Sequence, residues 1–399
     1  MSNVAGLEGS PFRDSRYPLV LAGSIFPQST TKGSVKEFQP LSVGQAGVTK
    51  QLERVAQQQG DADRKLVEPG DLVINSRSDR RGASGLSSLT GLVSVVYTVL
   101  KPRTEYIDSR YAELLFKSKA FQDEYYRWGT GIVDDLWSTR YERFASIRLP
   151  LPPLETQRRI ADYLDKETAQ IDTLTAELDG YVELLEKRRR ETISTAVSSL
   201  PNGSPFELVP LNLIIRVADG LVDPLDEEFS ELPLIAPNHI EKNTGKLIEP
   251  IESAREQGAI SGKGFVRAGQ VVYSKIRPAL NKVTIANQDS LCSADMYPLE
   301  TMGNVHERFL LYALIDKRFV ESAVVESSRV AMPKVNRETL GVLRIPLPDL
   351  DTQRRIADYL DKETARIDTL IKECRELKEI LLKRRQVLIT DVVTGKVEV

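Results

Sequence analysis

Cysteine and histidine are scarce in this chain. Among 399 residues there are two cysteines, Cys292 and Cys374, and two histidines, His239 and His306. Two cysteines cannot build the disulfide framework of a small secreted domain, and this number suits a reducing cytosol. The cysteines and histidines also lack the spacing of a metal site. These absences favour a cytoplasmic protein and exclude disulfide scaffolds and zinc modules.

Long hydrophobic runs are missing as well. No apolar segment approaches the ~18–20 residues that a membrane span needs. The first residues, Met1 to Gly6, show neither the basic region nor the apolar region of a secretory signal. We therefore expect no membrane partner and no secretion.

The chain has no excess of positive charge. Its formal net charge is −3. Residues 1–147 hold 19 Lys and Arg against 17 Asp and Glu, and residues 206–343 hold 15 against 19. An autonomous nucleic-acid binder is usually basic, so composition alone does not indicate DNA. A DNA-binding function would require local basic patches, with partner proteins supplying much of the phosphate contact.

Catalytic signatures are absent too. The segment Gly258–Gly264 superficially resembles a phosphate-binding loop, but it lacks the four-residue gap and the Ser or Thr after its lysine. No Gly-x-Ser-x-Gly, no glycine-rich dinucleotide loop and no Asp/Asn-Pro-Pro-aromatic motif for base methylation occurs. Adjacent acids such as Asp134 and Asp135 are common on solvated surfaces. We predict no catalytic residue, no metal and no cofactor of its own.

The dominant positive feature is an internal repeat. Residues 148–189 and 344–385 align without gaps, with 29 of 42 positions identical and fourteen consecutive matches at 156–169 and 352–365. Such self-similarity indicates two copies of one unit, each a variable segment followed by a duplicated block. The predicted domains are residues 1–148, 149–200, 201–344 and 345–399.

The duplicated blocks read as helices. Each opens with prolines, and no glycine or proline then follows until Gly180 in the first copy and Gly395 in the second. Apolar residues recur at heptad spacing, which is typical of a coiled-coil seam. The stripes are Ile171, Leu174, Leu178, Tyr181 and Leu185, and Ile367, Leu370, Cys374, Leu377 and Leu381. Each stripe could pack on its own domain, but two matching stripes in one chain favour pairing.

Chain order predicts how the helices pair. The first helix leaves the first variable segment and reaches the second through the Ser/Pro/Gly-rich linker at residues 198–205. The second helix starts at the second segment, so a pair must be antiparallel, with a pseudo-two-fold axis between the repeats. A helix of about 30 residues spans ~45 Å. That length is slightly more than the ~34–36 Å of one DNA turn.

The two variable segments share a layout although their sequences differ. Each has a strand after a glycine turn (residues 68–74 and 267–273) that runs into a polar, basic stretch. A second strand is expected at 91–100 or 295–299, and a helix at 106–127 or 306–325. A second loop follows at 128–138 or 327–336. We predict α+β domains of one fold with different surfaces, joined by two long helices packed as an antiparallel coiled coil.

The order of these parts resembles the specificity subunit of type I restriction–modification systems. The resemblance rests on the repeated PLPxLxTQRRIADYLD block and on the C-terminal ITDVVTGK segment, and it covers essentially the whole chain. The variable segments resemble target recognition domains, and the helices resemble conserved spacers. One departure is Thr-Gln in the block, where Glu-Gln is common in the family.

The resemblance implies sequence-specific recognition of double-stranded DNA. Each recognition domain would read one half of an interrupted site, and the helices would set the unread gap. Two methyltransferase subunits would dock on this chain, and restriction subunits would complete the nuclease. The methyl donor, ATP and magnesium would belong to those partners, so this chain is expected to be non-catalytic.

Base edges are read mainly by Arg or Lys at guanine and by Asn or Gln at adenine. Both basic loops of each variable segment therefore supply candidates, although base readout and phosphate contact cannot be separated from sequence. For the first domain they are Ser76, Arg77, Arg80, Arg81, Ser84, Arg127, Trp128 and Thr130. For the second they are Lys275, Arg277, Asn281, Lys282, Ser328, Arg329, Lys334 and Asn336.

Several alternatives stay open at this point. The chain could be a coiled-coil scaffold without DNA readout, or an orphan subunit that serves methylation alone. Residues 156–159 and 352–355 either anchor the methyltransferase or cap and solvate the helix. The basic runs 186–190 and 382–385 could contact DNA or an acidic partner, but charges near a helix end favour a solvated face.

Overall fold

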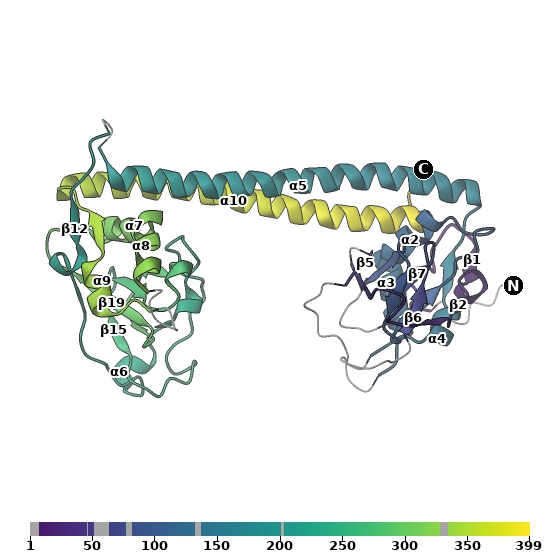
Figure 1. Ribbon diagram of the computed structural model, residues 1–399, viewed down its shortest axis with the longest axis horizontal. Helices are drawn as coiled ribbons and strands as arrows, with labels where there is room; N and C mark the ends of the chain where they lie inside the picture. Colours follow the sequence, from purple (N-terminus) through teal and green to yellow (C-terminus); the bar gives the residue numbers. More distant parts are fainter. Residues whose placement is uncertain are drawn as a thin grey trace. The chain divides into compact units, whose positions relative to one another are not determined.

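The computed structural model describes residues 8–45, 47–51, 64–76, 82–131, 137–200, 203–327 and 334–399. The chain divides into two compact units, Met1–Leu178 with Glu376–Val399, and Asp179–Arg375. Each unit combines one variable domain with part of the helix α5 (Leu154–Ser198) and part of α10 (Leu350–Val393) (Figure 1). Within the described ranges no helix is both long and apolar enough to cross a bilayer.

The first domain is built on a four-stranded antiparallel sheet in the order β2-β10-β7-β8. Its strands are β2 (Gln28–Ser29), β10 (Tyr97–Leu100), β7 (Leu72–Asn75) and β8 (Ser84–Leu86). Smaller sheets join β3 (Lys32–Gly33), β6 (Arg64–Val67) and β9 (Gly91–Val93), and pair β4 (Leu41–Gly44) with β5 (Gly47–Lys50). The first and last strands, β1 (Leu19–Leu21) and β11 (Arg148–Pro150), pair where the chain enters and leaves the domain.

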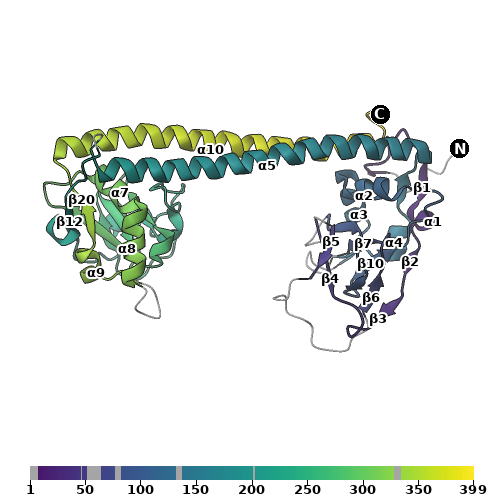
Figure 2. The ribbon, with the colours of Figure 1, turned by 45° about the horizontal axis from the view of Figure 1, so that its top comes forward.

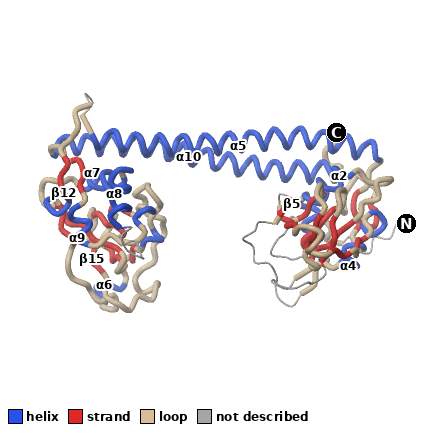
Figure 3. Tube along the Cα trace, in the orientation of Figure 1, coloured by secondary structure: helices blue, strands red, loops and turns tan. Residues whose placement is uncertain are grey.

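The second domain repeats the order of the four-stranded sheet, whereas the strand order of its second sheet differs. Its four-stranded antiparallel sheet has the order β13-β19-β16-β17, with β13 (Ile215–Val217), β19 (Met296–Thr301), β16 (Val271–Ser274) and β17 (Val283–Ile285). A second sheet contains β14 (Leu234–Ile235), β18 (Ser290–Cys292) and β15 (Gly264–Val266). The entry and exit strands β12 (Leu208–Pro210) and β20 (Arg344–Pro346) pair as β1 and β11 do. The expected α+β fold is therefore present in both domains, as the strand and helix colours of Figure 3 show.

In each domain, the single helix expected after the sheet is divided into two helices. In the first domain α2 (Ser109–Lys117) and α3 (Lys119–Arg127) are separated at Ser118, whose side chain accepts a hydrogen bond from the amide of Phe121. In the second, α7 (Glu307–Ile315) and α8 (Lys317–Ser327) are separated at Asp316. The expectation of one helix was wrong in both domains; in the first, the buried Ser118 caps the new helix, and in the second the buried Asp316 accepts from the side chain of Arg318. Short helices complete the domains, namely α1 (Ala22–Ile25), α4 (Tyr141–Ala145), α6 (Glu227–Ser230) and α9 (Arg337–Val342), with 3₁₀ turns η3 (Leu211–Leu213), η4 (Pro237–His239) and η5 (Pro278–Leu280).

Each domain packs its helices on the sheet through a separate core. In the first domain that core is aromatic, with Phe116 and Phe121 stacked at a centroid distance of 4.2 Å and Phe26 and Phe144 beside them. The second core is mainly aliphatic around Phe309. Residues of α5 and α10 enter both cores, so burial of apolar surface joins each domain to the helices in its unit.

The two long helices run antiparallel within each unit. In the second unit Arg189 of α5 pairs with Asp368 of α10, and Glu186 pairs with Arg375, so the numbering falls along one helix as it rises along the other. In the first unit Asp172 pairs with Arg385. Figure 2 shows the two helices side by side. At 45 and 44 residues they are longer than the ~30 residues expected, because each helix continues beyond the end of the duplicated block, and α5 also continues through Gly180.

The coiled-coil seam differs from the predicted stripe in part. Leu185 and Ile367 are buried as expected. Leu174, Tyr181 and Leu377, by contrast, are 46–47% exposed, whereas Thr175 and Ile371 are buried. The less exposed positions still alternate by three and four residues, at 171, 175, 178, 182 and 185 on α5 and at 367, 371, 374, 378 and 381 on α10. The heptad period was therefore right, and the predicted stripe chose the wrong residue at one position of each heptad.

A buried glutamine fixes the start of each long helix to its domain. Gln157 accepts a hydrogen bond from the amide of Asp108 (2.8 Å) and donates to the carbonyls of Tyr106 (3.0 Å) and Pro152 (2.8 Å). Gln353 forms the same three bonds with His306, Asn304 and Pro348, at the same distances. Both side chains are fully buried. The glutamine of each duplicated block therefore has a structural role, while Arg158 and Arg159 beside Gln157 stay exposed.

Two aspartates of the repeated block add a second link to the domain. Arg110, in the first turn of α2, lies 2.8 Å from Asp162 and 3.2 Å from Asp165. In the second unit Arg308 pairs in the same way with Asp358 and Asp361. These groups are about half exposed, so each pair contributes little alone, but together they orient the helix on the domain.

We expect Gln157→Ala to lower the free energy of unfolding by about 3 kcal/mol, since it leaves one amide and two carbonyls buried without partners. Arg158→Ala is the matched control. The Arg158 side chain is 64% exposed, and its ion pair with Asp108 is long, at 4.0 Å. The loss of unfolding free energy in this variant should therefore be about 0.5 kcal/mol or less. Urea denaturation followed by circular dichroism measures both. Equal stability of the two variants would contradict the structural role of Gln157.

Candidate nucleic-acid interface

The first basic loop of the first domain begins where β7 ends. Asn75 is buried, and its backbone N–H donates to the carbonyl of Ala83 (2.8 Å). Ser76 is half-buried, its hydroxyl donates to the carbonyl of Val96, and its own carbonyl accepts from the amide of Thr139 (3.3 Å). The candidates Arg77, Arg80 and Arg81 follow and lie outside the described residues. The end of β7 therefore anchors the base of this loop through its backbone.

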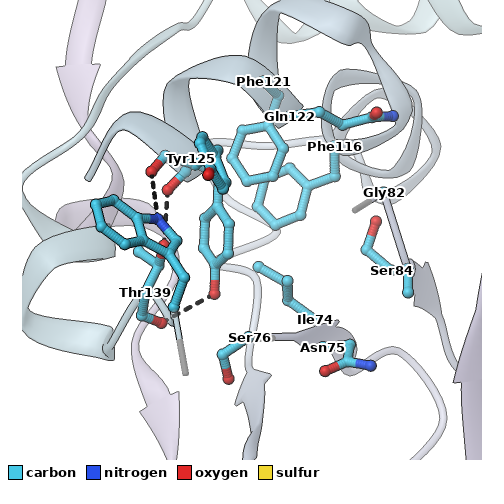
Figure 4. Close-up of a pocket in the computed structure, with 13 residues that line it drawn as sticks. Ile74, Asn75, Ser76, Gly82, Ser84, Phe116, Phe121, Gln122, Tyr125 and Thr139 are labelled. Carbon is cyan, nitrogen blue, oxygen red and sulfur yellow. Dashed lines mark hydrogen bonds between the residues drawn. The ribbon is translucent and has the colours of Figure 1, made fainter. Parts of the chain in front are cut away.

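Aromatic side chains line a cavity beside the end of β7 (Figure 4). Phe116, Phe121 and Tyr125 surround a cavity of about 30 Å³ beside Ser84. This volume suits one water and excludes a nucleobase. Ser84 is buried, and its hydroxyl makes no hydrogen bond to any described residue. Burial raises the pKa of Tyr125, so its hydroxyl stays protonated and donates to the carbonyl of Thr139 (3.1 Å).

The second loop of this domain is fixed by Trp137. Its indole N–H donates to the carbonyl of Tyr126 (3.1 Å), and the two rings lie 5.5 Å apart. A Cβ at Gly129 would fall 2.1 Å from Trp137 Nε1, so only glycine fits under the indole. Thr130, a predicted candidate, pairs its backbone with Ser138 and is exposed.

The candidates Arg127 and Trp128 bind an acid of their own domain. Glu124 is 2% exposed and accepts hydrogen bonds from Arg127 Nη2 (2.7 Å) and from the Trp128 indole (2.9 Å). A buried carboxylate needs such partners, so both side chains contribute to the stability of α3. The Arg127 side chain remains 35% exposed at the surface.

An open groove of about 380 Å³ lies beside Ser76. Its polar lining includes Gln28, Lys65, Ser138 and Arg140. Lys65 Nζ donates to the carbonyl of Tyr97 (2.6 Å), and burial lowers its pKa. The sequence reasoning missed this groove because its residues come from five separate segments.

In the second domain the corresponding loop leaves β16 at Lys275. The Lys275 carbonyl accepts from the amide of Val335 (2.8 Å), as that of Ser76 accepts from Thr139. The ammonium of Lys275 lies 5.5 Å from the centroid of the Tyr297 ring, a cation–π contact. Lys334 is exposed, and its backbone bridges to Ile276. The structure thus brings the two predicted loops of this domain together and places Lys275 and Lys334 on adjoining segments.

Two residues of this loop have left-handed backbone. Arg277 (φ 49°) precedes η5 and Asn281 (φ 42°) follows it. Non-glycine residues in this region carry strain, which is often retained at functional sites. Arg277 is exposed, so its guanidinium reaches solvent.

The remaining candidates of the second domain divide between internal and exposed positions. Asn281 is buried and donates to the carbonyl of Ile315 (3.3 Å), and Lys282 Nζ donates to the carbonyl of Ile240. Asn336 is exposed, and its side chain caps α9 by accepting from the amide of Thr339 (2.7 Å). Ser328 and Arg329 lie outside the described residues.

Across the described ranges, no cluster of three or more His, Cys, Asp or Glu side chains could hold a metal ion. The corresponding loops present hydroxyl, amide and cationic groups, which suit hydrogen bonding to base edges and phosphates.

Comparison with known proteins gives consistent matches. Residues 47–180 and 232–380 match the family described as the type I restriction modification DNA specificity domain. The chain is 30% identical over 260 residues to the specificity subunit of the Escherichia coli type I restriction enzyme EcoDI, covering 57% of each chain. It thus spans about 57% of that relative. The specificity subunit of MjaVIII from Methanocaldococcus jannaschii is 23% identical over 338 residues, which cover 77% of this chain and 75% of that protein.

Solved structures share the fold. A chain from a study of complex assembly and conformational transition in the type I R-M system has a TM-score of 0.72 and 17% identity, covering 96% of this chain and 98% of that one. The crystal structure of the HsdS subunit from Thermoanaerobacter tengcongensis gives a TM-score of 0.53 and 18% identity, with coverage of 96% and 97%. At these identities the likeness concerns the fold.

We expect Gly129→Ala to displace Trp137, shift the tryptophan fluorescence emission and destabilise the protein by about 2 kcal/mol, as overpacking does. Gly180→Ala is the control, because a Cβ there meets open space on α5 and should stabilise the helix by about 0.5–1 kcal/mol. Emission spectra and urea titrations distinguish the two. A Gly129→Ala protein with wild-type emission would contradict the packing of the indole on Gly129.

Proposed function

Because this chain belongs to the type I restriction modification DNA specificity family, we propose that it is the DNA-reading subunit of a methyltransferase complex. Each variable domain reads one half of an interrupted double-stranded site. The long helices set the number of unread base pairs between the halves. The chain itself supplies recognition, and the chemistry resides on its partners.

One observation above all supports this function. Two domains of the same strand order carry different side chains at the same place, the end of the central strand β7 or β16. Ser76 stands at that position in the first domain and Lys275 in the second, each carbonyl accepting from the loop before the short helix α4 or α9. A constant scaffold with exchanged loop residues is what two readers of different sequences require.

The predicted loops remain the proposed DNA contacts. In the first domain they comprise Ser76 to Ser84, including Arg77, Arg80 and Arg81, and Arg127 to Thr130. In the second, the exposed cations Arg277 and Lys334 with the half-buried Lys275 are the leading groups. Ser84 and Asn281 are buried, so they would act by shaping their loops.

The near-neutral charge points to binding within a complex. A chain of net charge −3 gains little from neutralising phosphates by itself. We propose two methyltransferase subunits as partners, with restriction subunits joining for cleavage. Methyl donor, ATP and magnesium would be bound by those partners.

Co-expression with the methyltransferase subunit of the same locus, followed by single-base mapping of adenine methylation, tests the function. We expect an interrupted two-part motif. Lys275→Ala with Arg277→Ala should relax one half about tenfold, because one base pair contributes ~1–3 kcal/mol of discrimination. Alanine at Arg77, Arg80 and Arg81 should relax the other half.

Arg267→Ala provides the control. Arg267 is an exposed cation of the same domain, but it lies before β16, at the opposite end of that strand from Lys275. Its removal should leave the motif unchanged. Methylation that is absent, or that does not depend on this chain, would contradict DNA reading and favour a scaffold that joins proteins.

A further inference from the structure

Arg189 is a buried cation in the middle of the basic run of α5. Its side chain is 6% exposed, although the run was predicted to be a solvated face. Its guanidinium is permanently charged, so burial requires partners for its N–H groups. Nε lies 3.1 Å from Asp368 Oδ1 on α10, Nη1 donates to the carbonyl of Asn243 (3.1 Å), and Nη2 to that of Thr244 (3.0 Å). One side chain thus joins both long helices to a turn of the second domain.

That turn, residues 241–246, is internally closed. The amide of Glu241 donates to the carbonyl of Lys246 (2.9 Å), and the amide of Lys246 donates to the Thr244 hydroxyl (3.1 Å). Lys246 Nζ lies 2.7 Å from Asp368 Oδ2, which adds a second link to α10. Gly245 has a φ of 81°, and a Cβ there would approach Ile315 to 3.1 Å, so the turn also lies close against α7. Because the turn is bonded to α10 and packs against α7, its position depends on both helices.

The other side of the turn contacts the proposed reading loop. The amide of Asn243 donates to the carbonyl of Asn281 (3.3 Å), and the Thr284 hydroxyl donates to the carbonyl of Gly245 (2.8 Å). Lys282 Nζ donates to the carbonyl of Ile240. Asn281 and Lys282 end the loop that carries Lys275 and Arg277. A continuous set of hydrogen bonds therefore runs from the long helices to the loop.

We infer that Arg189 is a positioning residue for sequence readout by the second domain. It holds the turn 241–246, and through it the loop 275–282, at a set place on the long helices. This inference rests on the proposed function. Arg189 lies far from the reading loop in sequence, yet by this inference it contributes to the specificity of one half-site.

The internal repeat offers a matched control. Arg385 occupies the position of Arg189 in the second copy, and Asp172 that of Asp368. This pair is 3.0 Å apart, but its side chains are 30% and 56% exposed. Replacing Arg385 therefore removes an equivalent Arg–Asp ion pair between the long helices and leaves the buried contacts of Arg189 with the second domain intact.

The experiment uses the complex with its methyltransferase subunit and compares wild type, Arg189→Ala, Arg189→Lys and Arg385→Ala. Methylation is mapped at sites that differ by one base in either half. Arg189→Ala should raise methylation at sites changed in the half that Lys275 and Arg277 read, by about tenfold. Arg189→Lys should give an intermediate effect, since an ammonium keeps the charge but cannot span all three partners. Arg385→Ala should leave that half strict.

Hydrogen exchange on the free chain supplies a second readout. Exchange should accelerate at residues 241–246 and 275–282 in Arg189→Ala and stay unchanged there in Arg385→Ala. A folded Arg189→Ala protein with both halves strict, or with both halves relaxed equally, would overturn the inference. If that variant does not fold, Arg189→Lys decides by the same criterion. A wild-type complex without any two-part motif would instead overturn the proposed function.

Discussion

The arrangement of each unit depends on the hydrogen bonds of one buried glutamine side chain, Gln157 in the first unit and the equivalent Gln353 in the second. A chain that leaves a domain and enters a long helix exposes carbonyls in its proline-led link and amides at the neighbouring helix start. Each glutamine satisfies one such amide and two carbonyls at once, in a fully buried position. Because the same three bonds recur around Gln353, helix and domain keep one geometry in both copies.

That constancy explains why the duplicated block is so nearly identical while the domains differ. Residues of the block have defined partners. The glutamine bonds to the domain backbone, the two aspartates pair with Arg110 or Arg308, and the apolar positions of the seam pack against the other long helix. In the domain loops beyond the strand ends, the constraint common to both domains is a backbone hydrogen bond, from Thr139 to Ser76 and from Val335 to Lys275. The side chains of these loops are therefore free to differ, as Ser76 and Lys275 do at corresponding positions.

Local signals in the sequence predicted much of the architecture. Strand and turn patterns located β7 and β16, and the repeat predicted two copies of one unit with antiparallel helices. The same reasoning failed where a choice depends on neighbours in space. The expected helices are divided at the buried residues Ser118 and Asp316, and Ser118 caps the helix that follows it. Arg189 was assigned to a solvated face because nothing in its own segment reveals the turn that covers it.

The candidate interface shows the same division. Its loops were located from sequence, yet Asn281 and Lys282 bond within the domain, and Arg127 and Trp128 bind the buried Glu124. A charge or amide has the same identity in sequence whether it faces solvent or a buried acid.

The sequence by itself determined the repeat, the α+β class, the antiparallel helices and the family, because these follow from periodicity, chain order and local propensity. Only the tertiary structure decided the seam, the internal partners of the candidate residues and the link from the helices to the second domain. These depend on hydrogen bonds and burial between residues far apart in the chain, and no local pattern encodes them.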